Sequence, residues 1–97
     1  MQKLTTPTLL AIQIYGEEHQ KRKAIEELGE LITALAREAD GRSSSEEIIT
    51  EIADVDIMLE QLKLIYGIDA CLRERKRKLE RLLKRITNGK GENTEAG

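Results

Sequence analysis

The chain has 97 residues and a formal net charge of −2, and 35% of its residues are charged while only 2% are aromatic. A chain of this length forms one domain with a modest core, so we expect it to self-associate, and its charge balance argues against a protein coated in basic residues for binding nucleic acid. A lone cysteine, Cys71, excludes an intramolecular disulfide, and the lack of a leader or long apolar run predicts a cytoplasmic protein outside the membrane.

Two helices are predicted in the first forty residues. Thr6 and Pro7 form a plausible cap and first-turn pair for a short helix that Gly16 closes. The next helix is predicted from about Glu17 to Ala39, because Asp40-Gly41 ends it. Its expected packed seam has the spacing of core positions and consists of Ile25, Leu28, Ile32 and Leu35.

Two further helices are predicted in the second half. Three serines at 43–45 precede Glu46 and Glu47, which is a capping-box signature for a helix that reaches Tyr66. The expected apolar face of that helix is Ile48, Ile52, Val55, Leu59, Leu62 and Tyr66. A fourth helix is predicted over about 69–86, and residues 88–97 are expected to form a flexible tail. The expected fold is therefore all-α, with one four-helix bundle domain over 1–87 that is completed by oligomerisation.

Two pairs of carboxylates are the most informative feature of the sequence. Glu27 with Glu30, and Glu51 with Asp54, are each spaced so that both acids project from one side of a helix. Helix phase places Glu51 and Asp54 beside Met58, on the inward flank of their helix, where solvation does not explain them. The two pairs should therefore meet between the helices.

Such a cluster is costly without a cation. Two like charges about 4 Å apart cost on the order of 4 kcal/mol at an effective dielectric near 20, whereas a small domain has about 5–15 kcal/mol of net stability. Oxygen ligands without an inward histidine favour a hard cation, so we predict Mg²⁺ or Mn²⁺ rather than zinc.

The motifs also resemble those of a known family. Glu26-Glu27-x-x-Glu30, a spacer of about twenty residues and Glu51-x-x-Asp54 resemble the signature of the MazG-like all-α nucleoside triphosphate pyrophosphohydrolases. This resemblance implies a hydrolase of nucleotide metabolism that cleaves a nucleoside triphosphate to the monophosphate and pyrophosphate. It also implies that Glu27, Glu30, Glu51 and Asp54 are metal ligands, and that Glu26 holds a second metal or orients the attacking water.

Several assignments stay open at the level of sequence. Gln20 and Lys23 lie on the acidic side of the second helix and are weaker candidates for substrate binding. The base, the sugar, the number of metals and the choice between homodimer and homotetramer are not specified. The main alternative function is a small helical module that binds nucleic acid or another protein through the basic run of the fourth helix, which consists of Arg73, Arg75, Lys76, Arg77, Lys78, Arg81, Lys84 and Arg85.

Overall fold

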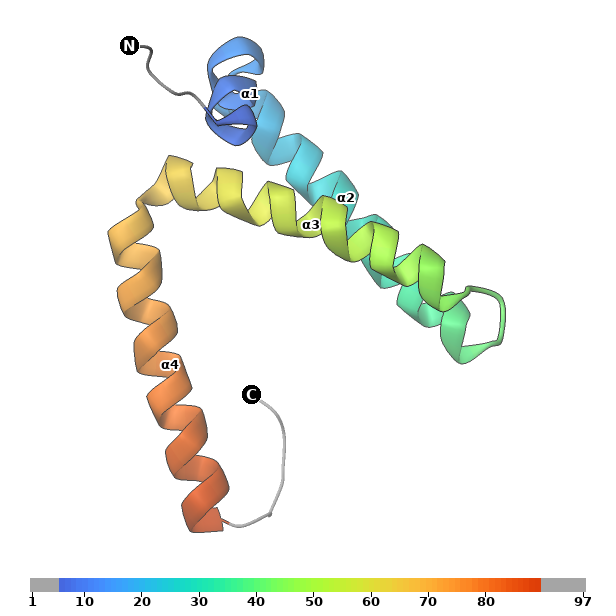
Figure 1. Ribbon diagram of the computed structural model, residues 1–97, viewed down its shortest axis with the longest axis vertical. Coiled ribbons are helices and arrows are strands. Elements are labelled where there is room, and N and C mark those ends of the chain that lie inside the picture. The colour runs from blue at the N-terminus through green and yellow to red at the C-terminus, as the bar shows by residue number, and fades with distance from the viewer. Residues whose placement is uncertain (1–5, 90–97) are drawn as a thin grey trace. The chain divides into compact units, whose positions relative to one another are not determined.

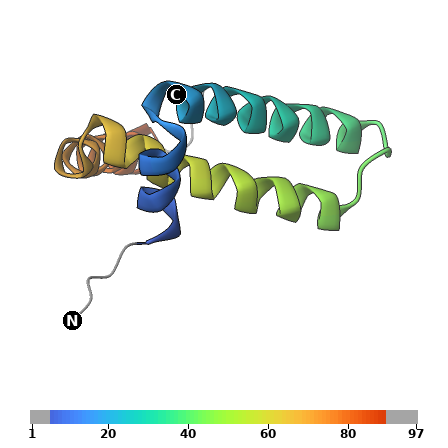
Figure 2. The same ribbon diagram turned by 90° about the horizontal axis from the view of Figure 1, so that it is seen from above.

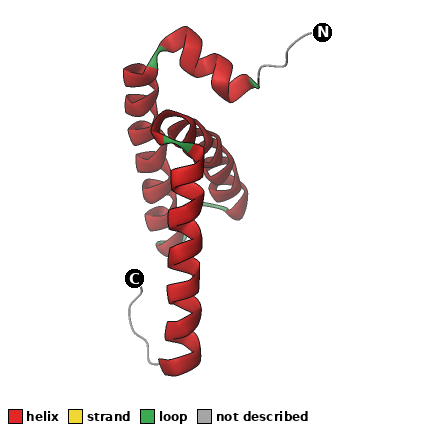
Figure 3. Ribbon diagram, turned by 90° about the vertical axis from the view of Figure 1, so that its left-hand side faces the viewer, coloured by secondary structure: helices red, strands yellow, loops and turns green. Residues whose placement is uncertain are grey.

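The computed structural model describes residues 6–89, and within this range all regular structure is helical (Figures 1 and 3). The helices are α1 (Pro7–Tyr15), α2 (Glu17–Ala39), α3 (Ser45–Tyr66) and α4 (Ile68–Gly89). The all-α class and the four helices are therefore confirmed. The chain divides into two compact units, Met1–Ile65 and Tyr66–Gly97. The predicted domain boundary at residue 87 stays a prediction. Helix α4 continues to Gly89, past its predicted end at about 86, so the first two residues of the predicted tail are helical, and the rest of that tail lies outside the described residues.

The helix ends follow from the local sequence. Thr6 Oγ1 accepts a hydrogen bond from the Leu9 amide at 3.2 Å and caps α1. The Glu47 amide donates to Ser44 Oγ at 3.2 Å while the Ser44 amide donates to Glu47 Oε1 at 3.0 Å, which confirms the capping box of α3. Gly16 separates α1 from α2 at φ 93°, a left-handed conformation that favours glycine.

In the first unit, α2 and α3 lie side by side and antiparallel, joined by a short loop (Figures 1 and 2). Helix α1 folds back from the start of α2 across this hairpin (Figure 2). Thr8 Oγ1, on α1, donates to Glu60 Oε2 on α3 at 3.1 Å. Gln20 Nε2, on α2, donates to Gln61 Oε1 at 2.7 Å in a buried hydrogen bond. Side-chain polar contacts thus join all three helices.

The packed side of α2 differs from the predicted seam. Ile25 and Ile32 are 69% and 68% exposed, and Leu28 and Leu35 are also exposed. The residues that α2 buries are instead Gln20, Ala24 and Ala34. The side of α2 that carries the small alanine side chains is therefore the buried one, and the larger aliphatic side chains point outward. The predicted seam was therefore wrong for the single chain.

The buried side of α3 was predicted in part, and it is rotated about the helix axis relative to the predicted apolar face. Ile48 and Val55 are buried as expected, but Met58 and Gln61 are buried too. Ile52, Leu59 and Tyr66 are exposed, which corrects their assignment to the core. The rotation moves the buried side toward Glu51 and Asp54, both of which are half-buried.

Exposed aliphatic residues of both helices lie on one side of the hairpin. At about 100° per residue, seven of the exposed aliphatic residues of α2 and α3 are displaced in the same sense from the line that joins the two helices, which places them together in an antiparallel pair. We call this set the aliphatic face, and it consists of Ile25, Leu28, Ile32, Leu35, Ile49, Ile52 and Leu59. The carboxylates are displaced in the opposite sense, so they lie on the other side of the hairpin.

The second unit contributes the amphipathic helix α4. None of its residues is buried, and Cys71 is half-buried. Ion pairs join Lys76 to Glu80 at 3.8 Å and Arg77 to Glu74. The Arg77 guanidinium, by hydrogen bonding, lowers the pKa of Glu74. None of the described helices is long and apolar enough to cross a membrane.

Candidate carboxylate metal site

Three predicted carboxylates converge between α2 and α3. One carboxylate oxygen from each of Glu27, Glu51 and Asp54 lies within 4.8 Å of the other two. Two oxygens bound to one Mg²⁺ at about 2.1 Å are at most about 4.2 Å apart, so a small side-chain rotation brings this set to binding distance. We call these three residues the carboxylate triad.

The triad contains carboxylate oxygens without partners. Glu27 Oε1 and Glu51 Oε1 are both buried and accept no hydrogen bond. A buried acceptor that lacks a partner is costly, and more so when it carries charge. The Glu27 side chain is only 12% exposed, so water reaches it poorly. The triad therefore fits a hard divalent cation, which oxygen donors of this kind bind.

Glu30 lies next to the triad and is not part of it. The Glu27 charge, partial burial and the Glu51 charge raise the pKa of Glu30 above its ordinary value. The side chain itself is exposed. Glu30 is therefore placed to add a ligand from the open side, since it already interacts with two members of the triad.

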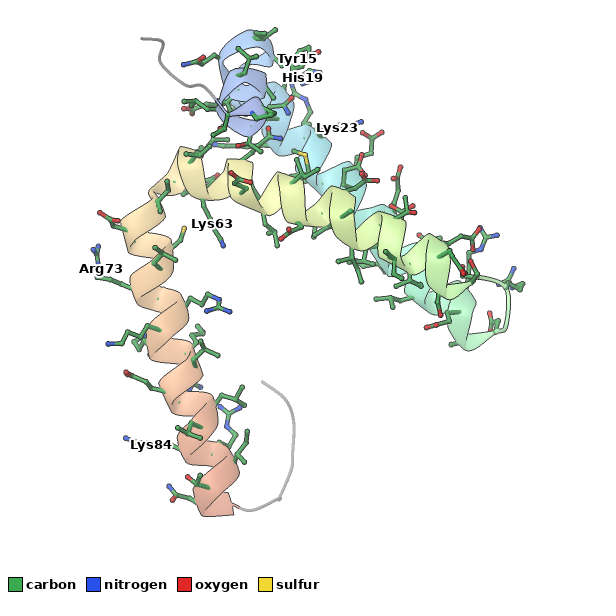
Figure 4. All side chains as sticks on the ribbon, viewed as in Figure 1. Tyr15, His19, Lys23, Lys63, Arg73 and Lys84 are labelled. Atoms are coloured by element: carbon green, nitrogen blue, oxygen red, sulfur yellow. The ribbon has the colours of Figure 1, made fainter. Side chains whose placement is uncertain are left out.

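Lys23 and Glu26 border the triad on its exposed side. Lys23 Nζ lies 3.5 Å from Glu26 Oε1 and 3.4 Å from Glu27 Oε2. The Glu26 charge and hydrogen bonds to both glutamates raise the pKa of Lys23. Its side chain projects from α2 (Figure 4), and both Lys23 and Glu26 are exposed. The lysine partly offsets the negative charge of the cluster.

Gln20 has a different environment from the one predicted. It is 5% exposed, and its amide donates to Gln61 while its Oε1 lies 2.7 Å from His19 Nδ1. Both ends of the Gln20 amide are thus engaged within the protein. The sequence did not indicate Gln61, which is 3% exposed, because glutamine is usually a surface residue. Nearby, Tyr15 stacks on His19 with ring centroids 5.4 Å apart (Figure 4).

A pocket of about 470 Å³ adjoins the triad toward the α2–α3 loop. It shares Glu30 and Glu51 with the carboxylate cluster, and Arg37 also lines it. The sequence analysis did not single out Arg37. The available signal was its position seven residues after Glu30, which places both on nearly the same side of α2.

Comparison with protein-family models, with curated proteins and with solved structures found no match for this chain.

Proposed function

We propose that the protein is a divalent-metal-dependent nucleoside triphosphate pyrophosphohydrolase, with Mg²⁺ as the preferred ion and Mn²⁺ as a substitute. The observation that carries this proposal is the carboxylate triad with two buried, unpartnered oxygens, Glu27 Oε1 and Glu51 Oε1. The resemblance of the two carboxylate motifs to those of MazG-like enzymes supplies the reaction.

The proposed roles follow from position. Glu27, Glu51 and Asp54 hold the ion, and Glu30 completes its ligands from the exposed side. When bound, the ion neutralises phosphate charge and lowers the pKa of a water molecule. Glu26 would orient that water. As the oxygen of the water bonds to the α-phosphorus, the water loses a proton to solvent, and the bond from the α-phosphorus to the bridging oxygen of the β-phosphate breaks. Pyrophosphate then leaves as the second product beside the nucleoside monophosphate.

A panel assay tests this function. The protein is incubated with ribo- and deoxyribonucleoside triphosphates and Mg²⁺, and both monophosphate and pyrophosphate are measured. We expect metal-dependent turnover of at least one nucleotide and its loss in Glu51→Gln and Asp54→Asn. Asp56→Asn is the matched control, because Asp56 lies two residues from Asp54 on the exposed side of α3. Absence of turnover with every nucleotide contradicts the proposal.

Self-association is the second part of the proposal. The aliphatic face includes Ile25, Ile32 and Ile49, each more than 60% exposed, and a contiguous exposed apolar surface is typical of an interaction site. We propose that a second copy covers it, since two such hairpins bury their faces as a helical bundle while the carboxylate triad stays on the opposite side. Light scattering should give a dimer or tetramer for the wild type and a monomer for Ile32→Asp, whereas an unchanged mass contradicts this assignment.

The basic surface of α4 supports an alternative function. Arg73, Arg75 and Lys78 are exposed and form no ion pair within the described residues, and such cations bind nucleic-acid phosphates with strong salt dependence. Retention of RNA or DNA that falls steeply with salt, and that is lost when Arg73 and Arg75 are neutralised, would favour this alternative. Nucleic-acid retention that persists in the variant with Arg73 and Arg75 neutralised would count against this alternative.

A further inference from the structure

The pocket beside the carboxylate triad has a polar lining that the proposed metal site does not explain. Its residues come from α2, the loop and the start of α3, and they are Glu26, Gly29, Glu30, Thr33, Ala34, Arg37, Ser43, Glu47 and Glu51. Two hydroxyls and one guanidinium are available to donate hydrogen bonds, and no aromatic ring lines the pocket. A nucleobase would find no ring on which to stack here, whereas phosphate oxygens would find donors.

Arg37 is the only basic residue of this lining. Arg42, the next arginine along the chain, pairs with Asp40 at 3.0 Å, but Arg37 forms no ion pair within the described residues. Residues Glu30 and Arg37 are two helical turns apart, about 10.5 Å along α2. Side chains on a helix lean toward its N-terminus, which is the direction of Glu30 from Arg37, and both residues line the pocket.

Gly29 provides a second observation. It lies in the middle of α2, where glycine costs about 1 kcal/mol relative to alanine. A Cβ atom built at this position would meet no other protein atom within 4 Å, so packing does not explain the glycine. The bare backbone instead faces the pocket, and a ligand can approach it closely there.

Charge determines how an anion is able to enter. The lining includes four carboxylates and one guanidinium, so a bare polyphosphate would be repelled. A divalent ion bound at the triad would offset the negative charge of both the carboxylates and the polyphosphate. The far end of the polyphosphate would then reach Arg37.

We propose that this pocket binds the phosphate chain of a metal-bound nucleoside triphosphate, with the Arg37 guanidinium on the terminal phosphate. This inference rests on the proposed function and adds the orientation of the bound nucleotide. The phosphate chain extends toward the α2–α3 loop, and the nucleoside lies on the other side of the triad.

Calorimetry with inorganic tripolyphosphate and Mg²⁺ tests the inference without hydrolysis of a nucleotide. The wild type should bind tripolyphosphate in Mg²⁺ and not in EDTA, and Arg37→Gln should weaken binding at least tenfold. Arg37→Lys should recover part of the loss, since lysine keeps the charge but not the two-pronged geometry. Arg42→Gln is the matched control and should bind as the wild type does, with circular dichroism showing equal helix content in all variants.

Equal binding by Arg37→Gln and the wild type, or no binding by the wild type, overturns the inference. The nucleotide panel separates this result from the proposed function. Turnover that requires Glu51 but is unaffected by Arg37→Gln leaves the enzyme proposal intact and removes Arg37 from it. Arg37-dependent tripolyphosphate binding without turnover of any nucleotide leaves the anion site and removes the enzyme.

Discussion

Glu51→Gln should stabilise the metal-free protein while it abolishes turnover. The Glu51 carboxylate repels those of Glu27 and Asp54, and at 4.8 Å each pair interacts by about 3.5 kcal/mol at an effective dielectric of 20. Solvent screening at these half-buried side chains, and the Lys23 charge on Glu27, reduce the combined gain to about 1–3 kcal/mol. For a small domain this raises the melting temperature by at least about 4 °C.

Differential scanning fluorimetry in EDTA and in Mg²⁺ measures the effect. Mg²⁺ should raise the melting temperature of the wild type, because an ion that binds only the folded state stabilises it. It should have little effect on Glu51→Gln, and Asp56→Asn should behave as the wild type does in both conditions. A Glu51→Gln protein that is less stable than the wild type in EDTA would refute the reasoning, because the carboxylate would then be a structural partner.

Three further results are expected. Because the Glu27 charge, burial and the Glu51 charge raise the pKa of Glu30, its stabilising contribution is full below about pH 4.5 and is lost as the pH rises through the raised value. In EDTA, the wild type should therefore lose stability relative to Glu30→Gln as the pH rises from about 4 to about 7, so the variant's melting temperature should increase relative to that of the wild type. A constant difference between the two melting temperatures contradicts this. Gly29→Ala should raise the melting temperature, because alanine favours the helix by about 1 kcal/mol, and should lower kcat/KM by crowding the pocket; an unchanged kcat/KM would show that no ligand approaches Gly29. Gln61→Leu should destabilise the protein by about 1–3 kcal/mol in urea titrations, because it leaves the Gln20 amide buried without its partner, and Gln20→Leu in the same chain should recover most of that loss.

The boundaries of α1, α2 and α3 were predictable because they depend on local chemistry, whereas α4 extends past its predicted end. Thr6, Gly16 and the Ser44–Glu47 capping box act within a few residues of themselves, so the sequence contains the whole interaction. The spacing and helical phase of the carboxylates were likewise sufficient to predict that Glu27, Glu51 and Asp54 lie together. The helical repeat of 3.6 residues determines which residues share one side of a helix.

The choice of packed side was not predictable in the same way. Both sides of α2 are able to pack, one through Ala24 and Ala34 and the other through larger residues such as Ile25 and Ile32. The side of α2 that meets α3 depends on the surface of α3, which the sequence of α2 does not contain. Hydrophobicity alone favoured the side with the larger aliphatic residues, which is exposed in the structure. The pocket and Arg37 were missed for a related reason, since a pocket arises from the separation of two helices and has no pattern of its own in either.

The buried hydrogen bond between Gln20 and Gln61 sets the alignment of the hairpin. Glu27 follows Gln20 by seven residues on α2, and Asp54 precedes Gln61 by seven residues on the antiparallel α3. The two intervals therefore span the same distance, about 10.5 Å. Sliding one helix past the other by a single turn would break the amide pair and separate Glu27 from Asp54 at the same time. Two neutral side chains that are not part of the carboxylate cluster thus fix the helix register that places the acids opposite one another.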